Sequence, residues 1–208
     1  MKRLLLFFAA VAFSVRVDAD PPPSAPLQEL DPAAALSVKR NAEIEFGKYR
    51  AIFGETTLDD VRGMISLGTI LETRSAQAHE FYLCYTALHE GIDSKVWIVS
   101  DAEIGGNWHS VTRFVAVPAP NRLVSKDCPA LPSNMEPVGL EPSIWLGSDD
   151  EDLERYVGPI SRKDGAWRSY RFKTSGKCED GHDRMTWLAT KLERGRITLI
   201  HAGQFKSC

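Results

Sequence analysis

The sequence predicts an α+β fold built from two tandem modules, each an antiparallel sheet covered on one face by its helices. One pattern occurs twice: a glycine followed by capping polar residues opens an amphipathic helix that ends near a second glycine, over 54–68 and again over 147–158. In both copies, strand-like segments follow, with one cysteine near the first segment and another after the last. Because duplication enlarges one contact surface more readily than it assembles an active site, the repeat favours a two-module binding protein.

The first nineteen residues have the composition of an export signal. A basic start precedes an apolar run over 4–15, and 17–19 offers tolerated residues for cleavage. The run is shorter than the about 20 apolar residues that span a bilayer, and no cysteine near the cut could accept a lipid. We expect a signal peptide over 1–19 and a periplasmic or secreted product without a stable membrane anchor. Arg16 beside the cut leaves an uncleaved anchor as the alternative.

Charge and length limit the partners and the domain count. The whole chain has 25 basic and 28 acidic residues, and removal of 1–19 leaves 22 and 27, a net charge of -5. This balance argues against nucleic acid or an anionic membrane as the main partner. The remaining length fits one large domain or two small ones, and the repeat favours two. We expect a leader over 20–30, modules over 31–128 and 144–208, and a linker over 129–143.

The first helix is expected directly after the leader. Asp31 is a favourable N-cap and Pro32 suits the first helical position. Apolar residues then recur every three or four positions as far as Phe53, which predicts one apolar helical face. Gly47 weakens this helix in its second half.

A further short helix is expected at the start of each repeat. Thr57 with Asp60 resembles a capping box, and Ser148 with Glu151 is the standard box. The acidic run over 149–152 complements the positive end of the second helix dipole. We prefer this reading to a calcium loop, because the alternating aspartates and central glycine of such a loop are missing.

Strands are expected after these helices, and a proline-rich connector between the copies. Alternating or β-branched segments lie at 81–88, 96–99, 111–117, 167–172, 185–192 and 197–202. Glu193-Arg194-Gly195 predicts a tight hairpin between the last two. The prolines over 118–142 favour an extended connector.

Four cysteines in an exported chain predict two disulfides. Three pairings are possible, and the repeat selects the pairs within each copy, Cys84 with Cys128 and Cys178 with Cys208. Each closes a loop of roughly 30–45 residues, for which the chain-entropy model assigns about 3–4 kcal/mol. The sequence has no Cys-x-x-Cys motif, so we interpret these pairs as structural rather than redox-active.

The repeated pattern resembles the module shared by SmpA/BamE-type outer-membrane-assembly lipoproteins and the beta-lactamase inhibitory protein. The residues that carry the resemblance are Gly54, Thr56, Val61, Leu67, Gly68, Gly147, Leu153 and Gly158. The tandem arrangement is similar to the inhibitory protein more than to the single-module lipoproteins. The resemblance implies helix-helix-antiparallel-sheet modules, a joint sheet and a concave face that grips another protein. The inhibitor's enzyme-contacting loops do not align, so inhibition of a beta-lactamase itself is not expected.

The sequence lacks the familiar catalytic and metal-binding motifs. It contains no Gly-x-Ser-x-Gly, no His-Glu-x-x-His and no phosphate-binding glycine loop. We therefore expect a non-enzyme without cofactor or metal. The acidic and histidine side chains over 179–183 could hold a cation, although Asp180-Gly181 is also an ordinary turn, which we prefer. Carboxylates far apart in the chain can converge, so a hydrolase remains an alternative.

Aromatic and basic side chains are the candidates for partner contact, because Trp, Tyr and Arg dominate protein contact energies. If Phe81 and Leu83 face the helices, alternation places Tyr82 on the opposite face. The loop over 101–110 contains a Gly-Gly pair that permits an exposed tip, and the alternative is a loop whose aromatic side chains fold back over the sheet edge. The candidates are Tyr82, Trp97, Trp108, His109, Arg113, Trp167, Arg171, Trp187 and Lys191. Trp97 and Trp187 fit core positions equally well, since both lie between apolar neighbours.

These observations predict an exported protein that binds another protein. The most specific form of the prediction is an inhibitor or immunity protein that covers the site of an envelope-acting or secreted enzyme. A non-enzymatic scaffold for envelope assembly is the alternative.

Overall fold

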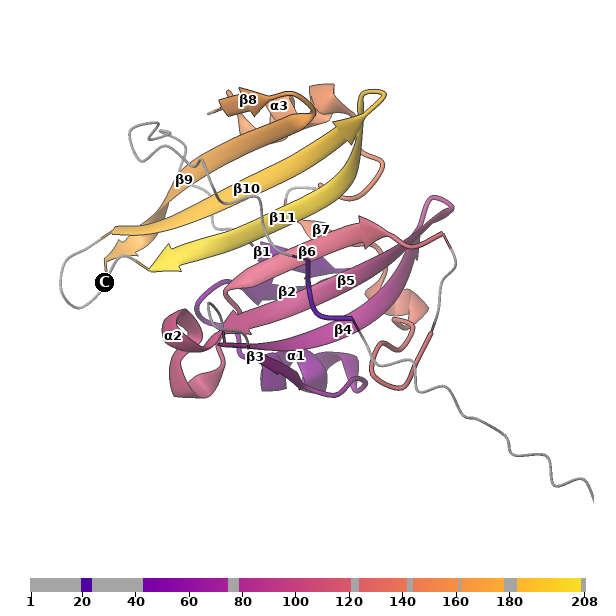
Figure 1. The fold of residues 1–208 in the computed structure, drawn as a ribbon, viewed down its shortest axis with the longest axis vertical. Helices are drawn as coiled ribbons and strands as arrows, with labels where there is room; N and C mark the ends of the chain where they lie inside the picture. Colours follow the sequence, from indigo (N-terminus) through magenta and orange to yellow (C-terminus); the bar gives the residue numbers. More distant parts are fainter. Residues whose placement is uncertain are drawn as a thin grey trace, which may run out of the picture.

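The computed structural model describes residues 20–23, 43–74, 79–120, 124–141, 144–160, 162–177 and 183–206. Its main element is an antiparallel sheet of eight strands in the order β3-β4-β5-β6-β11-β10-β9-β8 (Figure 1). The strands are β3 (Leu71–Arg74), β4 (His79–His89), β5 (Ile92–Asp101), β6 (Arg113–Pro118), β8 (Arg162–Asp164), β9 (Trp167–Lys177), β10 (Asp183–Glu193) and β11 (Arg196–Lys206). The strands of both repeats therefore lie in one sheet.

The two halves of the sheet are equivalent: counted from either edge to the centre, four strands follow one another in chain order. A helix precedes four strands in each half: α1 (Leu58–Ile65) precedes β3 to β6, and α3 (Asp150–Val157) precedes β8 to β11. The halves meet where β6 pairs with β11, with Val115 opposite His201. The last strand of each repeat thus lies in the centre of the sheet, and its first strand lies at an edge.

The predicted α+β fold of two helix-helix-antiparallel-sheet modules is wrong, because strands dominate the described residues. Within them each half has one eight-residue helix, and α2 (Ala102–Gly105) adds a single turn. The helix expected to end at Phe53 is instead a hairpin of β1 (Glu43–Phe46) and β2 (Tyr49–Ile52). Gly47 turns the chain with φ +55°, in space where a Cβ atom would lie 2.5 Å from the Asn134 carbonyl oxygen. The first part of that expected helix lies outside the described residues.

A second, three-stranded sheet contains chain from the proline-rich segment. Its order is β2-β1-β7, and β7 (Val138–Leu140) pairs with β1. Leu131 and Met135, which precede β7, are also buried. The described part of the expected linker therefore supplies a strand and core side chains instead of a free connector.

One face of the large sheet packs against the helices and the small sheet in a single apolar cluster. The sheet contributes Leu83, Tyr85, Ile98, Phe114, Tyr170, Leu188 and Ile200 to it. Leu58 and Val61 of α1, Leu153 of α3 and Phe46 of β1 complete the same cluster. The opposite face of the sheet, turned toward the viewer in Figure 1, carries most of the candidate contact residues.

One of the two predicted capping boxes is present, and so is the predicted last hairpin. Thr57 and Asp60 form the expected capping box, with Asp60 N donating to Thr57 Oγ1 at 3.1 Å. The second box does not form: the N-cap of α3 is Asp149, and Ser148 accepts instead from Trp145 N at 3.3 Å. The hairpin between β10 and β11 turns at Arg194 and Gly195, as expected.

The disulfide between Cys84 and Cys128 is formed, as the repeat predicts, with the two Cα atoms 4.6 Å apart. Cys178 and Cys208 lie outside the described residues, as does the expected signal peptide. None of the helices in the described ranges has the length and apolar character that a bilayer crossing requires. A disulfide is consistent with export to an oxidising compartment.

Candidate functional site

Most of the predicted contact residues lie on one face of the sheet, opposite the helices. The alternation expected in β4 is confirmed, because Leu83 and Tyr85 join the helix-side cluster while Tyr82 and Cys84 form a separate cluster with Trp97. Strand pairing places the candidates in β6, β9 and β10 on the same side of the sheet as Trp97. We call this surface the outer sheet face, and its candidate residues are Tyr82, Trp97, Arg113, Trp167, Arg171, Trp187 and Lys191.

The side chains in the centre of the outer sheet face are buried rather than exposed. Trp97 and Trp187 are each 3% exposed, and Tyr82 and Arg171 are also buried. The core interpretation of the two tryptophans, which the sequence left open, is therefore the one that the structure shows. These four residues stabilise the fold in this conformation, and direct contact with a partner needs other side chains.

Two candidates at the margin of this face are half-buried. Trp167 and Lys191 lie opposite each other in β9 and β10. The ammonium group of Lys191 is 2.9 Å from the carboxylate of Glu193, so this charge already has a partner within its own strand.

A buried ion pair lies at one end of the outer sheet face. Arg113 Nη2 is 3.0 Å from Glu80 Oε1, and the two side chains are only 16% and 11% exposed. Both line a small pocket of about 80 Å³ together with Trp187 and Gln204. Glu80 is not among the residues predicted from the sequence, although its position two residues before Tyr82 places it on the same face.

His201 is a second buried polar group that is not among the predicted residues. It is fully buried in β11 between Val115 and Ala189. Burial, assisted by the positive charge of Arg113, lowers the pKa of His201 to about 3. The imidazole is therefore neutral at neutral pH, and neither ring nitrogen has a hydrogen-bond partner among the described residues.

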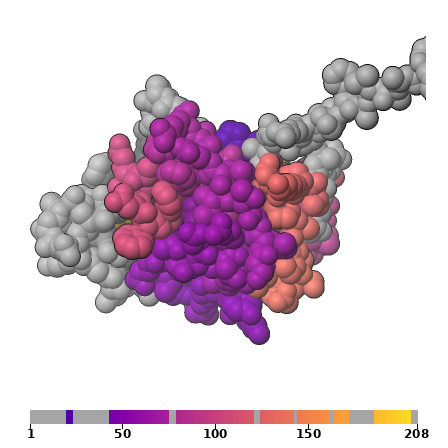
Figure 2. All heavy atoms as spheres, turned by 90° about the horizontal axis from the view of Figure 1, so that it is seen from below, coloured from indigo at the N-terminus to yellow at the C-terminus, as the bar shows by residue number. Residues whose placement is uncertain are grey.

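The loop after β5 presents a different kind of side chain. Trp108 lies at its tip, at the end of the 3-10 helix η2 (Gly106–Trp108), and is 82% exposed. The other exposed large apolar side chains of the described residues reach at most 56%. Figure 2 shows this loop in rose at the molecular surface, beside the purple atoms of the chain around α1.

The loop that carries Trp108 is held by hydrogen bonds at both ends. At its start, Asp101 Oδ1 accepts from the backbone N–H groups of Glu103 at 2.9 Å and Ile104 at 3.1 Å. Within the loop, Gly105 allows a close backbone approach, because a Cβ atom there would lie 2.8 Å from the carbonyl oxygen of Ser110.

At its end, the loop is tied to the start of α1. The Leu58 N–H donates to the carbonyl of His109 at 3.0 Å, and Thr57 forms a β-bridge with Ser110. The His109 ring packs against Phe81 with the ring centroids 4.0 Å apart. Of the two loop candidates, His109 therefore anchors the loop, while Trp108 projects from it.

Among the described residues, no group of three or more His, Cys, Asp or Glu side chains is placed to hold a metal ion. Residues 179–182 of the hairpin that we considered as a cation site lie outside the description.

In comparisons with protein-family models, with curated proteins and with solved structures, the chain has no match.

Proposed function

We propose that this is an exported protein-binding protein, and specifically an inhibitor or immunity protein that inserts Trp108 into a cleft of an envelope-acting or secreted enzyme. The observation that carries the proposal is the 82% exposure of Trp108 on a loop that is tied at both ends. The protein blocks its partner by steric cover and performs no chemistry itself. The compartment is the periplasm or the extracellular medium, which suits a disulfide-bonded chain.

Energetics favour Trp108 as an anchor. A tryptophan offers a large apolar area and one N–H donor, and its type is enriched among the few residues that dominate binding energies. A loop that is already ordered loses little conformational entropy on association. Trp108 therefore combines a large contact area with a low ordering cost.

The acidic side chains in the loop of Trp108 indicate what kind of partner cleft would complement it. Glu103 is exposed in the same loop, and Asp101 is half-buried at its start. A partner cleft with a basic rim would complement these carboxylates, and such complementarity raises association rates and specificity.

The test is a capture experiment with a matched control. The chain as exported is immobilised and exposed to envelope and secreted proteins, and the affinity of any captured enzyme is measured by calorimetry for the wild type, Trp108→Ala and Val124→Ala. Val124 is 56% exposed and lies outside the loop. We expect Trp108→Ala to weaken binding by at least roughly 30-fold, which corresponds to about 2 kcal/mol, and Val124→Ala to change it little.

Two results would contradict this proposal. Equal affinity of Trp108→Ala and the wild type rejects the anchor, and full activity of the captured enzyme in the complex rejects inhibition. Capture of an outer-membrane assembly complex instead of an enzyme would reject the inhibitor function and favour the alternative, a scaffold for envelope assembly.

A further inference from the structure

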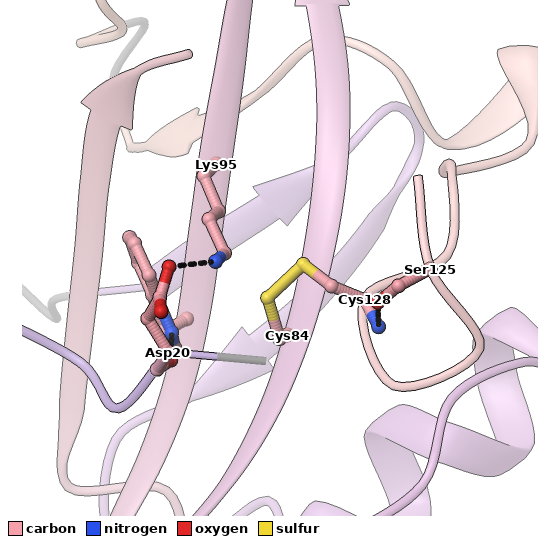
Figure 3. The surroundings of a disulfide bond; sticks show 6 residues. Asp20, Cys84, Lys95, Ser125 and Cys128 are labelled. Atoms are coloured by element: carbon pink, nitrogen blue, oxygen red, sulfur yellow. Dashed lines mark hydrogen bonds and ion pairs between the residues drawn. A yellow bond between two sulfur atoms is a disulfide. The ribbon is translucent and has the colours of Figure 1, made fainter. Parts of the chain in front are cut away.

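The N-terminal residues 20–23, Asp-Pro-Pro-Pro, lie on the outer sheet face across β5 and β6, where Figure 1 shows them in indigo. The indole N–H of Trp97 donates to the backbone carbonyl of Asp20 at 3.0 Å. Lys95 Nζ lies 3.1 Å from the Asp20 carboxylate, and Figure 3 shows these side chains pointing toward each other beside the Cys84–Cys128 disulfide. Pro22 is buried.

The sequence of this segment dictates an extended conformation. Proline fixes φ near -65°, and a residue that precedes proline is excluded from the helical region. Asp20, Pro21 and Pro22 each precede a proline, so the backbone is held in the polyproline II region. A polyproline II segment makes no internal hydrogen bonds, and its carbonyls need external donors. The Trp97 indole supplies such a donor.

Three groups on the sheet match the three features of the segment. Trp97 contributes a buried ring and its N–H, and Lys95 contributes a cation that lies 5.1 Å from the centroid of the Trp97 ring. Tyr82 is buried in the same packed cluster as Trp97 and so extends its aromatic surface. The site thus offers aromatic surface, an N–H donor and a positive charge to a segment with rings, a carbonyl and a carboxylate.

We propose that Trp97, Lys95 and Tyr82 form a binding site for an acidic proline segment in the polyproline II conformation, and that residues 20–23 of this chain are its occupant. The recognition combines an aromatic surface with hydrogen bonding to backbone carbonyls, as in other polyproline-binding grooves. A preformed segment loses little entropy on docking, so four residues suffice. The proposal is independent of Trp108 and of the enzyme partner.

Occupation of this site explains how the Trp97 indole is both buried and satisfied. A buried N–H needs an acceptor, and the acceptor comes from a segment more than seventy residues away in the chain. The segment follows directly after the expected signal peptide. Export and cleavage would therefore leave the new N-terminus on the sheet face, where it covers the Trp97 site.

The experiment measures hydrogen exchange of the Trp97 indole N–H by NMR. The full chain is produced with its own leader, purified as the cell exports it and labelled with 15N tryptophan, and Trp97→Phe assigns the resonance. In the wild type we expect exchange at least about tenfold slower than for the exposed Trp108 indole, because local opening must precede exchange.

Two residues of the segment are then changed together, Asp20→Ala and Pro22→Ser, which leaves the residues of the sheet unaltered. We expect Trp97 exchange to accelerate at least about tenfold, and added acetyl-Asp-Pro-Pro-Pro-Ser-amide at millimolar concentration to slow it again. An acetyl-Ala-Ser-Gly-Ser-Ser-amide control peptide should have no effect. Unchanged exchange in the variant, or equal effects of the two peptides, would overturn the proposal.

If the double variant does not fold, the Trp97 site is tested with Lys95→Met in the otherwise intact chain. It removes the ion pair with Asp20 and keeps the Trp97 ring. We expect a several-fold faster exchange of the Trp97 indole at an unchanged unfolding midpoint. Wild-type exchange in Lys95→Met would overturn the proposal.

Discussion

The indole of Trp187 packs directly on Gly203, its partner across β10 and β11. A Cβ atom on residue 203 would lie 2.9 Å from Cζ2 of Trp187 and 3.0 Å from the carbonyl oxygen of Thr112. The glycine is therefore required by space rather than by backbone conformation. It allows a large ring to be buried in the centre of the outer sheet face.

The first prediction concerns this contact. Gly203→Ala should lower the free energy of unfolding by about 1–3 kcal/mol, because the added methyl group must displace the indole or the backbone of residue 112. Urea denaturation monitored by tryptophan fluorescence measures the change. Gly63→Ala is the control: Gly63 lies exposed in α1 with nothing within 4 Å of the added Cβ, and should stabilise by roughly 0.5–1 kcal/mol. Equal stability of Gly203→Ala and the wild type would show that the ring moves freely.

The second prediction concerns the Glu80–Arg113 pair. Each side chain is less than one-fifth exposed, so removal of one partner leaves a poorly solvated charge. Arg113→Met and Glu80→Gln should each destabilise by about 3–5 kcal/mol, and the double variant should lose clearly less than the sum of the two. A double-mutant cycle from urea denaturation measures this coupling. Additive losses would mean that the two charges do not stabilise each other.

The local chemistry of several elements could be predicted from the sequence. The alternation in β4 assigned Leu83 and Tyr85 to one face and Tyr82 to the other, because only the side-chain period is needed. Thr57 with Asp60 defined the start of α1 for a similarly local reason. The pairing of Cys84 with Cys128 followed from the repeat. The Gly105-Gly106 pair permitted an exposed tip at Trp108 but did not distinguish it from a loop folded back over the sheet edge.

The wrong predictions lie where the local structure depends on segments that are far away in the sequence. Phe46, Tyr49 and Phe53 are spaced as on a helix, but Gly47 turns the chain and β7, more than eighty residues later, pairs with β1. Helical spacing alone cannot reveal such a partner strand. Alternation likewise assigns Trp97 to a face without showing what covers that face. The hydrogen bond from its indole to Asp20 depends on a segment far away in the sequence.

The third prediction concerns pH. The folded protein holds His201 neutral, with its pKa lowered from 6.5 to about 3, whereas the unfolded chain binds a proton as the pH falls below about 6.5. Between these values the unfolded state binds more protons, so stability falls as the pH decreases. The contribution is complete above pH 6.5 and is lost progressively toward pH 3.

His201→Leu isolates this contribution from that of the carboxylates. The free energy of unfolding is measured by urea denaturation from pH 7 to pH 4 for both proteins. We expect the wild type to lose up to about 1.4 kcal/mol per pH unit more than His201→Leu in the lower part of this range. Parallel pH dependences would mean that His201 can be protonated in the folded protein.

The fourth prediction concerns Thr57, which links α1 to the loop of Trp108. Its side chain caps the helix through Asp60 N, and its backbone forms a bridge with Ser110 at the end of that loop. Thr57→Ala should destabilise the protein by about 1 kcal/mol, while Thr57→Ser retains the hydroxyl and should lose only a few tenths. Because Leu58 N donates to the carbonyl of His109, fraying of the first turn should also loosen the loop. Hydrogen exchange of the amides over 104–110 should accelerate in Thr57→Ala and remain near wild type in Thr57→Ser. Faster amide exchange in α1 with unchanged exchange over 104–110 would show that the loop of Trp108 is held independently of the helix cap.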